Sequence, residues 1–249
     1  MLFILACGTC LPAWAEQVVL GLSMSEVEIT TNFDGSEILV FGAVKREAPV
    51  PEEPLDVVVA VAGPSLPVVV RRKERRFGIW VNTEAVEVDA APSFYAVATT
   101  RPLSEVLSNT EDLRHKVSIP RAIRSVGVAG QVEDPQSFTD AVIRIRQDSG
   151  AYSLQEGAVD LIDQTLFNTS IALPANLTEG DYPTRIFLTR AGAVVSVYET
   201  TIDVQKVGLE RWLFELSRQK PLIYGLMSLA IAIAAGWSAS AAFQVFRQR

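Results

Sequence analysis

The sequence predicts a mainly β fold: an immunoglobulin-like β-sandwich and a second β-rich domain with one helix, followed by a single C-terminal transmembrane helix. Residues 17–117 and 158–204 contain many β-branched residues that alternate with polar ones, which is the pattern of half-buried strands. Residues 135–150 instead repeat apolar residues at helical spacing. Residues 221–246 contain no Asp, Glu, Lys, Arg or His, and a helix of that length can cross the roughly 30 Å hydrocarbon core of a bilayer.

The N-terminal residues 1–15 have the pattern of a secretory signal peptide. They form a short uncharged apolar run that ends in Ala-Trp-Ala at 13–15, the small-x-small signature of signal-peptidase cleavage. We therefore expect a mature chain that begins at Glu16 and lacks both cysteines, Cys7 and Cys10, so that no disulfide or thiolate site is available. Lipid attachment at Cys7 is the alternative interpretation.

Residues 16–117 are predicted to form the immunoglobulin-like sandwich. The Asp34-Gly35 pair tolerates positive φ and indicates a hairpin turn. Residues 55–62 are almost wholly apolar, as expected for a central strand. About seven strand patterns follow one another at the spacing of such sandwiches, although the Cys-Trp-Cys set of antibody domains is missing.

A cluster of cations is predicted at or near the tip of the second hairpin of this domain. The cluster lies between apolar residues 68–70 and 77–81 and consists of Arg71, Arg72, Lys73, Arg75 and Arg76. Like charges so close together repel one another unless water, salt or an anionic partner is near. The cluster is therefore either a solvated tip or a partner-binding site for an acidic protein or an anionic small molecule.

After a linker at 118–134, residues 135–207 are predicted to form the second β-rich domain with an N-terminal helix. Asp134 provides an N-cap for that helix, and Pro135 suits its first position. The strand patterns that follow predict a sheet separate from that of the first domain.

Residues 208–220 have the pattern of an interfacial amphipathic helix, in which Trp212 acts as the interfacial anchor. The transmembrane helix, 221–246, would leave 247–249 as a cytoplasmic end. Small residues recur at every fourth position of this helix and predict a helix-packing ridge: Ser228, Ala232, Gly236 and Ser240. Alanine is also common in spans that pack against nothing.

Charge and side-chain chemistry argue against nucleic acid and against catalysis. The net charge is −7, which disfavours nucleic-acid binding. The one histidine, His115, lies between two cations and has no nucleophile motif to act with. Glu84, Glu87 and Asp89 could bind a cation only if a loop gathered them. The sequence therefore predicts no enzyme, no cofactor and no metal site.

Several short strings are similar to a family of transmembrane proteins of alphaproteobacteria. They are Phe-Asp-Gly-Ser at 33–36 with Val-Phe-Gly-Ala at 40–43, Gly-Ile-Trp-Val-Asn at 78–82, Pro-Ser-Phe-Tyr at 92–95, and Tyr-Gly-Leu through Gly-Trp over 224–237. The resemblance covers nearly the whole chain. It implies an inner-membrane anchor with an exported domain, and a genomic neighbourhood that suggests a multi-pass permease as a partner. The family is uncharacterised and has no catalytic residues to transfer.

These observations together favour a non-enzymatic, membrane-anchored accessory or scaffold protein that acts with another envelope protein. We expect it in the bacterial inner membrane, crossing once, with the bulk of the chain in the periplasm and with partner or self-association through the span. The alternative is a periplasmic ligand-binding or sensing module with a pocket between the two β domains.

Overall fold

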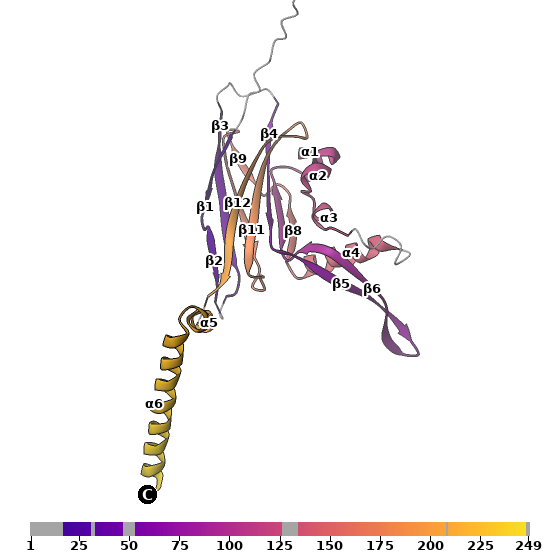
Figure 1. Cartoon of the computed structure of the whole chain (residues 1–249). Coiled ribbons are helices and arrows are strands. Elements are labelled where there is room, and N and C mark those ends of the chain that lie inside the picture. The colour runs from indigo at the N-terminus through magenta and orange to yellow at the C-terminus, as the bar shows by residue number, and fades with distance from the viewer. Residues whose placement is uncertain (1–16, 31–32, 47–52, 126–133, 208, 248–249) are drawn as a thin grey trace, which may run out of the picture. The chain divides into compact units, whose positions relative to one another are not determined.

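The computed structural model of the chain describes residues 17–30, 33–46, 53–125, 134–207 and 209–247 (Figure 1). The predicted signal peptide, residues 126–133 of the predicted linker and the last two residues therefore lie outside the described residues. Contacts divide the chain into two compact units. Met1–Val27 and Asp34–Val204 form the first, and Glu28–Phe33 and Gln205–Arg249 form the second.

Two sheets make up most of the first unit. The four-stranded sheet has the order β1 (Gln17–Leu22), β3 (Ser36–Lys45), β10 (Leu166–Leu173), β9 (Asp160–Ile162). The six-stranded sheet has the order β2 (Glu26–Ile29), β12 (Ala193–Lys206), β11 (Gly180–Arg190), β4 (Leu55–Ala62), β7 (Tyr95–Thr99), β8 (Tyr152–Gln155). The two sheets lie against each other as a β-sandwich (Figure 1). The predicted mainly β fold is confirmed.

The predicted domain boundary at 118–134 is wrong, because strands from both sides of it share both sheets. β10 pairs with β3 in the four-stranded sheet, and β11 pairs with β4 in the six-stranded sheet. β8 adds to β7 as a parallel neighbour. The strand patterns show where strands form but not which strands pair, and most pairings here join residues far apart in the chain.

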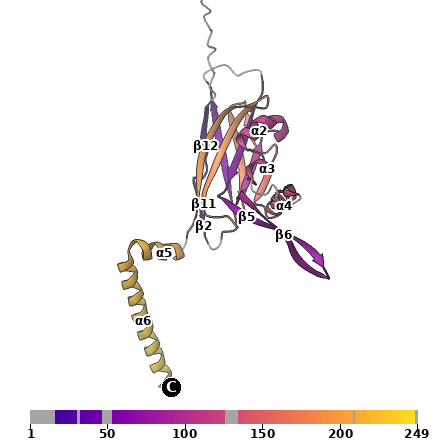
Figure 2. The ribbon, with the colours of Figure 1, turned by 45° about the vertical axis from the view of Figure 1, so that its right-hand side comes forward.

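The central strand β4 is buried on both faces, as its apolar sequence predicts. Alternate side chains such as Val57 and Val59 are fully buried on the face opposite to that of Val58 and Ala60. Val58 and Ala60 belong to a core that includes residues of the helical segments. These are α1 (Leu103–Val106), α2 (Asn109–His115), α3 (Ile119–Ala122) and α4 (Pro135–Asp148), which cover that side of the six-stranded sheet (Figure 2).

The predicted helix over 135–150 is confirmed as α4. The Asp134 side chain accepts a hydrogen bond from the Ser137 backbone N–H at 3.3 Å, and Pro135 occupies the first turn. Phe138 and Val142 lie on its buried side. The buried Tyr152 hydroxyl of β8 donates a hydrogen bond to the Pro92 carbonyl oxygen at 2.7 Å.

The second unit contains the two C-terminal helices. α5 (Leu209–Gln219) is followed by α6 (Pro221–Arg247), whose proline suits a helix start. Pro221–Ser240 is long and apolar enough to cross a bilayer, and none of that stretch is buried within the molecule. The predicted C-terminal apolar helix is confirmed.

Candidate interaction surfaces

The hairpin formed by β5 (Ser65–Arg76) and β6 (Ile79–Pro92) is a two-stranded sheet of its own that leaves the sandwich as a long ribbon (Figures 1 and 2). The part of the hairpin near the sandwich has a buried side. Val70 packs there with Val86 and with Phe138 of α4. This end of the hairpin is thus part of the fold.

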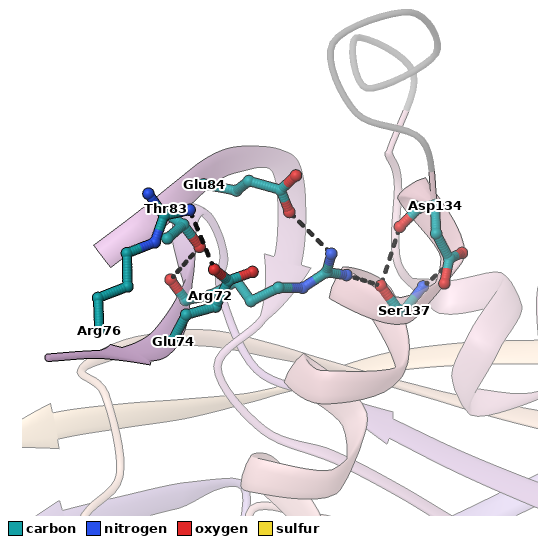
Figure 3. A network of polar contacts seen from close by, with 7 residues as sticks. All are labelled: Arg72, Glu74, Arg76, Thr83, Glu84, Asp134 and Ser137. Atoms are coloured by element: carbon teal, nitrogen blue, oxygen red, sulfur yellow. Dashed lines mark hydrogen bonds and ion pairs between the residues drawn. The ribbon is translucent and has the colours of Figure 1, made fainter. Parts of the chain in front are cut away.

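Arg72 links the next part of the hairpin to α4 through its side-chain hydrogen bonds (Figure 3). Its Nη1 donates to Glu84 Oε2 at 2.8 Å, and its Nη2 donates to Ser137 Oγ at 2.6 Å. The guanidinium carbon also lies 4.7 Å from the centre of the Phe138 ring. Arg72 therefore has a structural role in holding the hairpin to α4, and its part in partner binding stays a prediction.

Beyond Arg72 the hairpin register shifts, and the strands leave the body of the unit. The opposed pairs after the shift are Lys73 with Asn82, Glu74 with Val81, Arg75 with Trp80, and Arg76 with Ile79. Directly opposed residues share a face of a two-stranded sheet, so Arg75 and Trp80 lie on one side and Arg76 and Ile79 on the other.

The turn itself is apolar, not basic. Phe77 has φ 50° and Gly78 has φ 85°, so both central residues of the two-residue turn have positive φ, as in a type I′ turn. Phe77 is fully exposed, Ile79 is 65% exposed and Trp80 is 68% exposed. The basic residues thus lie just behind an aromatic end, where the sequence prediction had placed them at or near the tip.

Three of the five predicted cations have no counterion within the described part of the chain. Arg76 pairs with Glu74 at 3.2 Å, and Arg72 pairs with Glu84. Arg71, Lys73 and Arg75 are exposed and form no ion pair with any described residue. We define the hairpin tip as Lys73 and Arg75 together with Phe77, Ile79 and Trp80; Arg71 lies before the register shift, opposite Ala85, and is not part of the tip.

The apolar part of the tip was not predicted, because the sequence pattern assigned 77–81 to a strand that flanks the basic cluster. One feature of the sequence could have predicted the position of Phe77 in the turn. Gly78 is the only glycine between the two strands, and a two-residue hairpin turn needs positive φ at both central positions. That requirement places Phe77 in the turn, where its ring has no neighbours to pack against.

A second surface is the outward side of the four-stranded sheet. A row of opposed residues crosses all four strands in the order Val19, Ala43, Leu166, Ile162. The exposed fractions are 57% for Val19, 53% for Leu166 and 53% for Ile162. Because these residues alternate with buried ones, β3 and β10 are apolar on both sides at this end of the sheet.

Two further apolar residues of β3, Leu39 and Phe41, are exposed on the same side and extend the surface along the strand. The Phe41 ring covers Gly21, where an added Cβ would lie 2.4 Å from the ring. Acidic side chains stand at the margin: Glu37 accepts a hydrogen bond from Ser170, and Asp160 lies opposite Asn168. We call the row with Leu39 and Phe41 the outer apolar face. An antiparallel sheet that faces water is normally polar on that side.

The predicted sites on the C-terminal helices lie on exposed helix surface. Trp212 of α5 is exposed, and so are Ser228, Ala232, Gly236 and Ser240 of α6. A Cβ added at Gly236 would have no atom within 4 Å. The interfacial anchor and the packing ridge both remain predictions.

The residues considered for catalysis or metal binding have ordinary structural surroundings. His115 Nε2 lies 3.4 Å from Glu111 Oε2, and the His115 ring makes an edge contact with Phe187. Within the described residues there is no group of three His, Cys, Asp or Glu side chains placed to hold a metal ion. Since strands of both predicted domains share the same sheets, the described residues also contain no interface between two β domains at which the alternative function could place a pocket.

The comparison with family models gives a match over nearly the whole chain. Residues 17–245 match a model described as putative transmembrane protein (Alph_Pro_TM). No curated protein matches the chain. The match includes the β-rich unit as well as the apolar helix α6, in agreement with the candidate span at Pro221–Ser240. The chain therefore belongs to the Alph_Pro_TM family of transmembrane proteins.

Proposed function

We propose that the chain is a non-enzymatic, membrane-anchored accessory or scaffold protein that acts with another envelope membrane protein. The observation that carries this proposal is the outer apolar face, a patch of large exposed apolar side chains with polar residues at its margin. Contiguous apolar patches of this kind mark interaction sites on soluble surfaces. A single anchor holds the unit at a membrane, where its partners are other envelope components.

The chemistry of the outer apolar face favours a protein partner. Glu37 and Asp160 stand at one part of its margin and Lys45 at another, so the border has no excess of positive charge to attract the anionic phosphates of a lipid surface. The partner is therefore expected to present an apolar patch with polar residues of both charges around it.

The anchored unit is proposed to lie on the periplasmic side of a bacterial inner membrane. The signature of a signal peptide at 1–15 supports this orientation. Partner or self-association through the ridge of α6 is part of the same proposal. A multi-pass permease, which the family resemblance suggested, is one such partner.

The experiment isolates the tagged full chain from membranes in mild detergent and compares two matched substitutions. Val19→Lys places a charge in the outer apolar face, and Val69→Lys makes the same change on β5, where Val69 is 54% exposed. We expect the wild type and Val69→Lys to co-purify with one membrane protein in fixed stoichiometry, and Val19→Lys to lose it. Elution of the wild-type chain alone, or equal recovery by both variants, would refute docking through this face.

A further inference from the structure

The hairpin tip combines exposed apolar side chains with two cations that have no counterion among the described residues. Phe77 and Ile79 lie at the extremity, Trp80 lies opposite Arg75 on one side of the ribbon, and Lys73 lies two residues further back along the strand. This arrangement, apolar at the extremity with cations beside and behind it, suits a surface that is charged outside and apolar within.

Phe77 is an unexpected residue at its position. A type I′ turn favours Asn or Gly, because positive φ brings the Cβ of other residues too close to the backbone. With φ 50° and a fully exposed ring, Phe77 gains no packing within the chain that could offset this backbone cost. The ring therefore points to a contact outside the molecule.

The size of the tip decides between a protein and a membrane as that contact. A stable protein interface buries about 800 Å² on each partner and includes some 20 residues or more per side. The tip is the end of a two-stranded ribbon, whose strands lie about 5 Å apart, and it offers only a few side chains. A bilayer surface needs fewer contacts here, since the anchor α6 already holds the chain at the membrane and makes the second contact intramolecular.

The apolar and the cationic side chains of the tip match the layers of a bilayer surface. Indole and phenyl rings prefer the headgroup region, and Arg and Lys side chains are attracted by lipid phosphates. The net charge of −7 does not cancel this attraction, because charges act over only about 8 Å at physiological ionic strength. The cations of the tip therefore act as a local positive patch.

We propose that the hairpin tip is a second membrane contact, which inserts Phe77, Ile79 and Trp80 into the headgroup region of an anionic bilayer. Lys73 and Arg75 then face the phosphates. This goes beyond the proposed accessory role and is independent of it, because the lipid contact uses neither the outer apolar face nor any protein partner.

The test uses the purified full chain in nanodiscs, with Cys7 and Cys10 replaced by serine and one cysteine introduced for a fluorescent label. The label is placed at Ile79→Cys in the tip, or at Val69→Cys as a control on the same hairpin, because both residues are exposed. Quenching by lipids that carry a nitroxide near the headgroup reports contact with the bilayer. Thermal melts of both labelled chains establish that each is folded.

We expect strong quenching at Ile79→Cys and none at Val69→Cys in nanodiscs that contain phosphatidylglycerol. The quenching should be lost in pure phosphatidylcholine, after replacement of Lys73 and Arg75 by serine, and in high salt, since the screening length falls from about 10 Å at 0.1 M to about 3 Å at 1 M. Absence of quenching at Ile79→Cys in anionic nanodiscs overturns the proposal. So does equal quenching in phosphatidylcholine, or burial of the label only when a partner protein is added.

The quenching assay and the co-purification assay can fail independently of each other. The nanodiscs contain only this chain, so loss of the protein partner by Val19→Lys leaves the quenching unchanged. Failure of the lipid contact would likewise leave co-purification through the outer apolar face intact.

Discussion

Replacement of Phe77 by asparagine should stabilise the fold while it removes the most exposed ring of the hairpin tip. The substitution converts Phe77-Gly78 into Asn-Gly, the pair that type I′ turns favour most. Because the Phe77 side chain is fully exposed, its removal sacrifices no buried apolar contact. The expected change in the free energy of unfolding is therefore the relief of backbone strain alone.

The backbone strain at Phe77 sets the magnitude of the expected change in the free energy of unfolding. A residue with a Cβ pays about 1–2 kcal/mol in the left-handed region, and asparagine pays less because its short polar side chain bonds locally. At φ 50°, Phe77→Asn should gain about 1 kcal/mol. For a unit of about 150–250 residues, 1 kcal/mol corresponds to a rise in Tm of roughly 2–4 °C. Thermal denaturation of the full chain in detergent, followed by circular dichroism in the β region, measures it.

Two matched variants separate the turn from the ring. Phe77→Ala removes the ring but keeps a side chain that disfavours positive φ, so its Tm should stay near that of the wild type. Gly78→Ala adds a methyl group with no atom within 4 Å but at φ 85°, so it should lose about 1 kcal/mol through the backbone alone. A lower Tm for Phe77→Asn would mean that the ring stabilises the folded hairpin, and the inference from its position would fail.

Three further predictions address other parts of the chain. Burial raises the pKa of Tyr152 to about 12, so the folded state keeps the hydroxyl proton to a higher pH than the unfolded state does. The contribution of Tyr152 to the free energy of unfolding should be constant below the unfolded pKa near 10 and should fall by up to about 1.4 kcal/mol per pH unit between pH 10 and 12. Tyr152→Phe should lessen this fall, as measured by urea titrations. Arg72→Ser should cost about 1 kcal/mol in chemical denaturation because it breaks the link to α4, whereas Arg71→Ser should stay within about 0.5 kcal/mol. Gly236→Ile should abolish association through the span in cross-linking while Ile233→Leu preserves it, with membrane insertion unchanged in both; equal cross-linking would leave α6 as a plain anchor.

Local patterns predicted the elements whose formation depends on local interactions. Asp134 and Pro135 marked the start of α4, because an N-cap and a proline at the first position act within one turn. The run 221–246 predicted α6 from composition and length alone. The almost wholly apolar run 55–62 predicted a central strand, and β4 is that strand.

Pairing could not be predicted in the same way, since it depends on residues far apart in the chain. Nothing in the pattern of β3 shows that β10 lies beside it, with Ile171 opposite Ile38. The helical segment between the halves looked like a boundary, whereas it packs on the six-stranded sheet as a cover. A break in strand pattern is therefore weak support for a domain boundary, because a sandwich can place helices outside one of its sheets.

Sequence patterns also fail to show what covers an apolar residue, and for that reason the outer apolar face and the apolar part of the hairpin tip were missed. Leu39 and Phe41 are of the kind that fills a core, yet their side of the sheet is uncovered. Trp80 read as a strand residue beside the basic cluster, yet it projects from the end of the ribbon. Apolarity is a property of the residue, whereas exposure is a property of the fold.

The charges around the two surfaces give them different partners even though both are apolar. Glu37, Asp160 and Lys45 border the outer apolar face, whereas Lys73 and Arg75 belong to the hairpin tip. Charges at a surface are felt over about 8 Å in physiological salt, so each apolar patch is governed by its own border and not by the net charge. An anionic bilayer therefore attracts the tip more strongly than the outer apolar face, whose border has both signs of charge. A chain anchored by one helix can in this way hold its hairpin on the lipid and keep the face of its four-stranded sheet free for a protein.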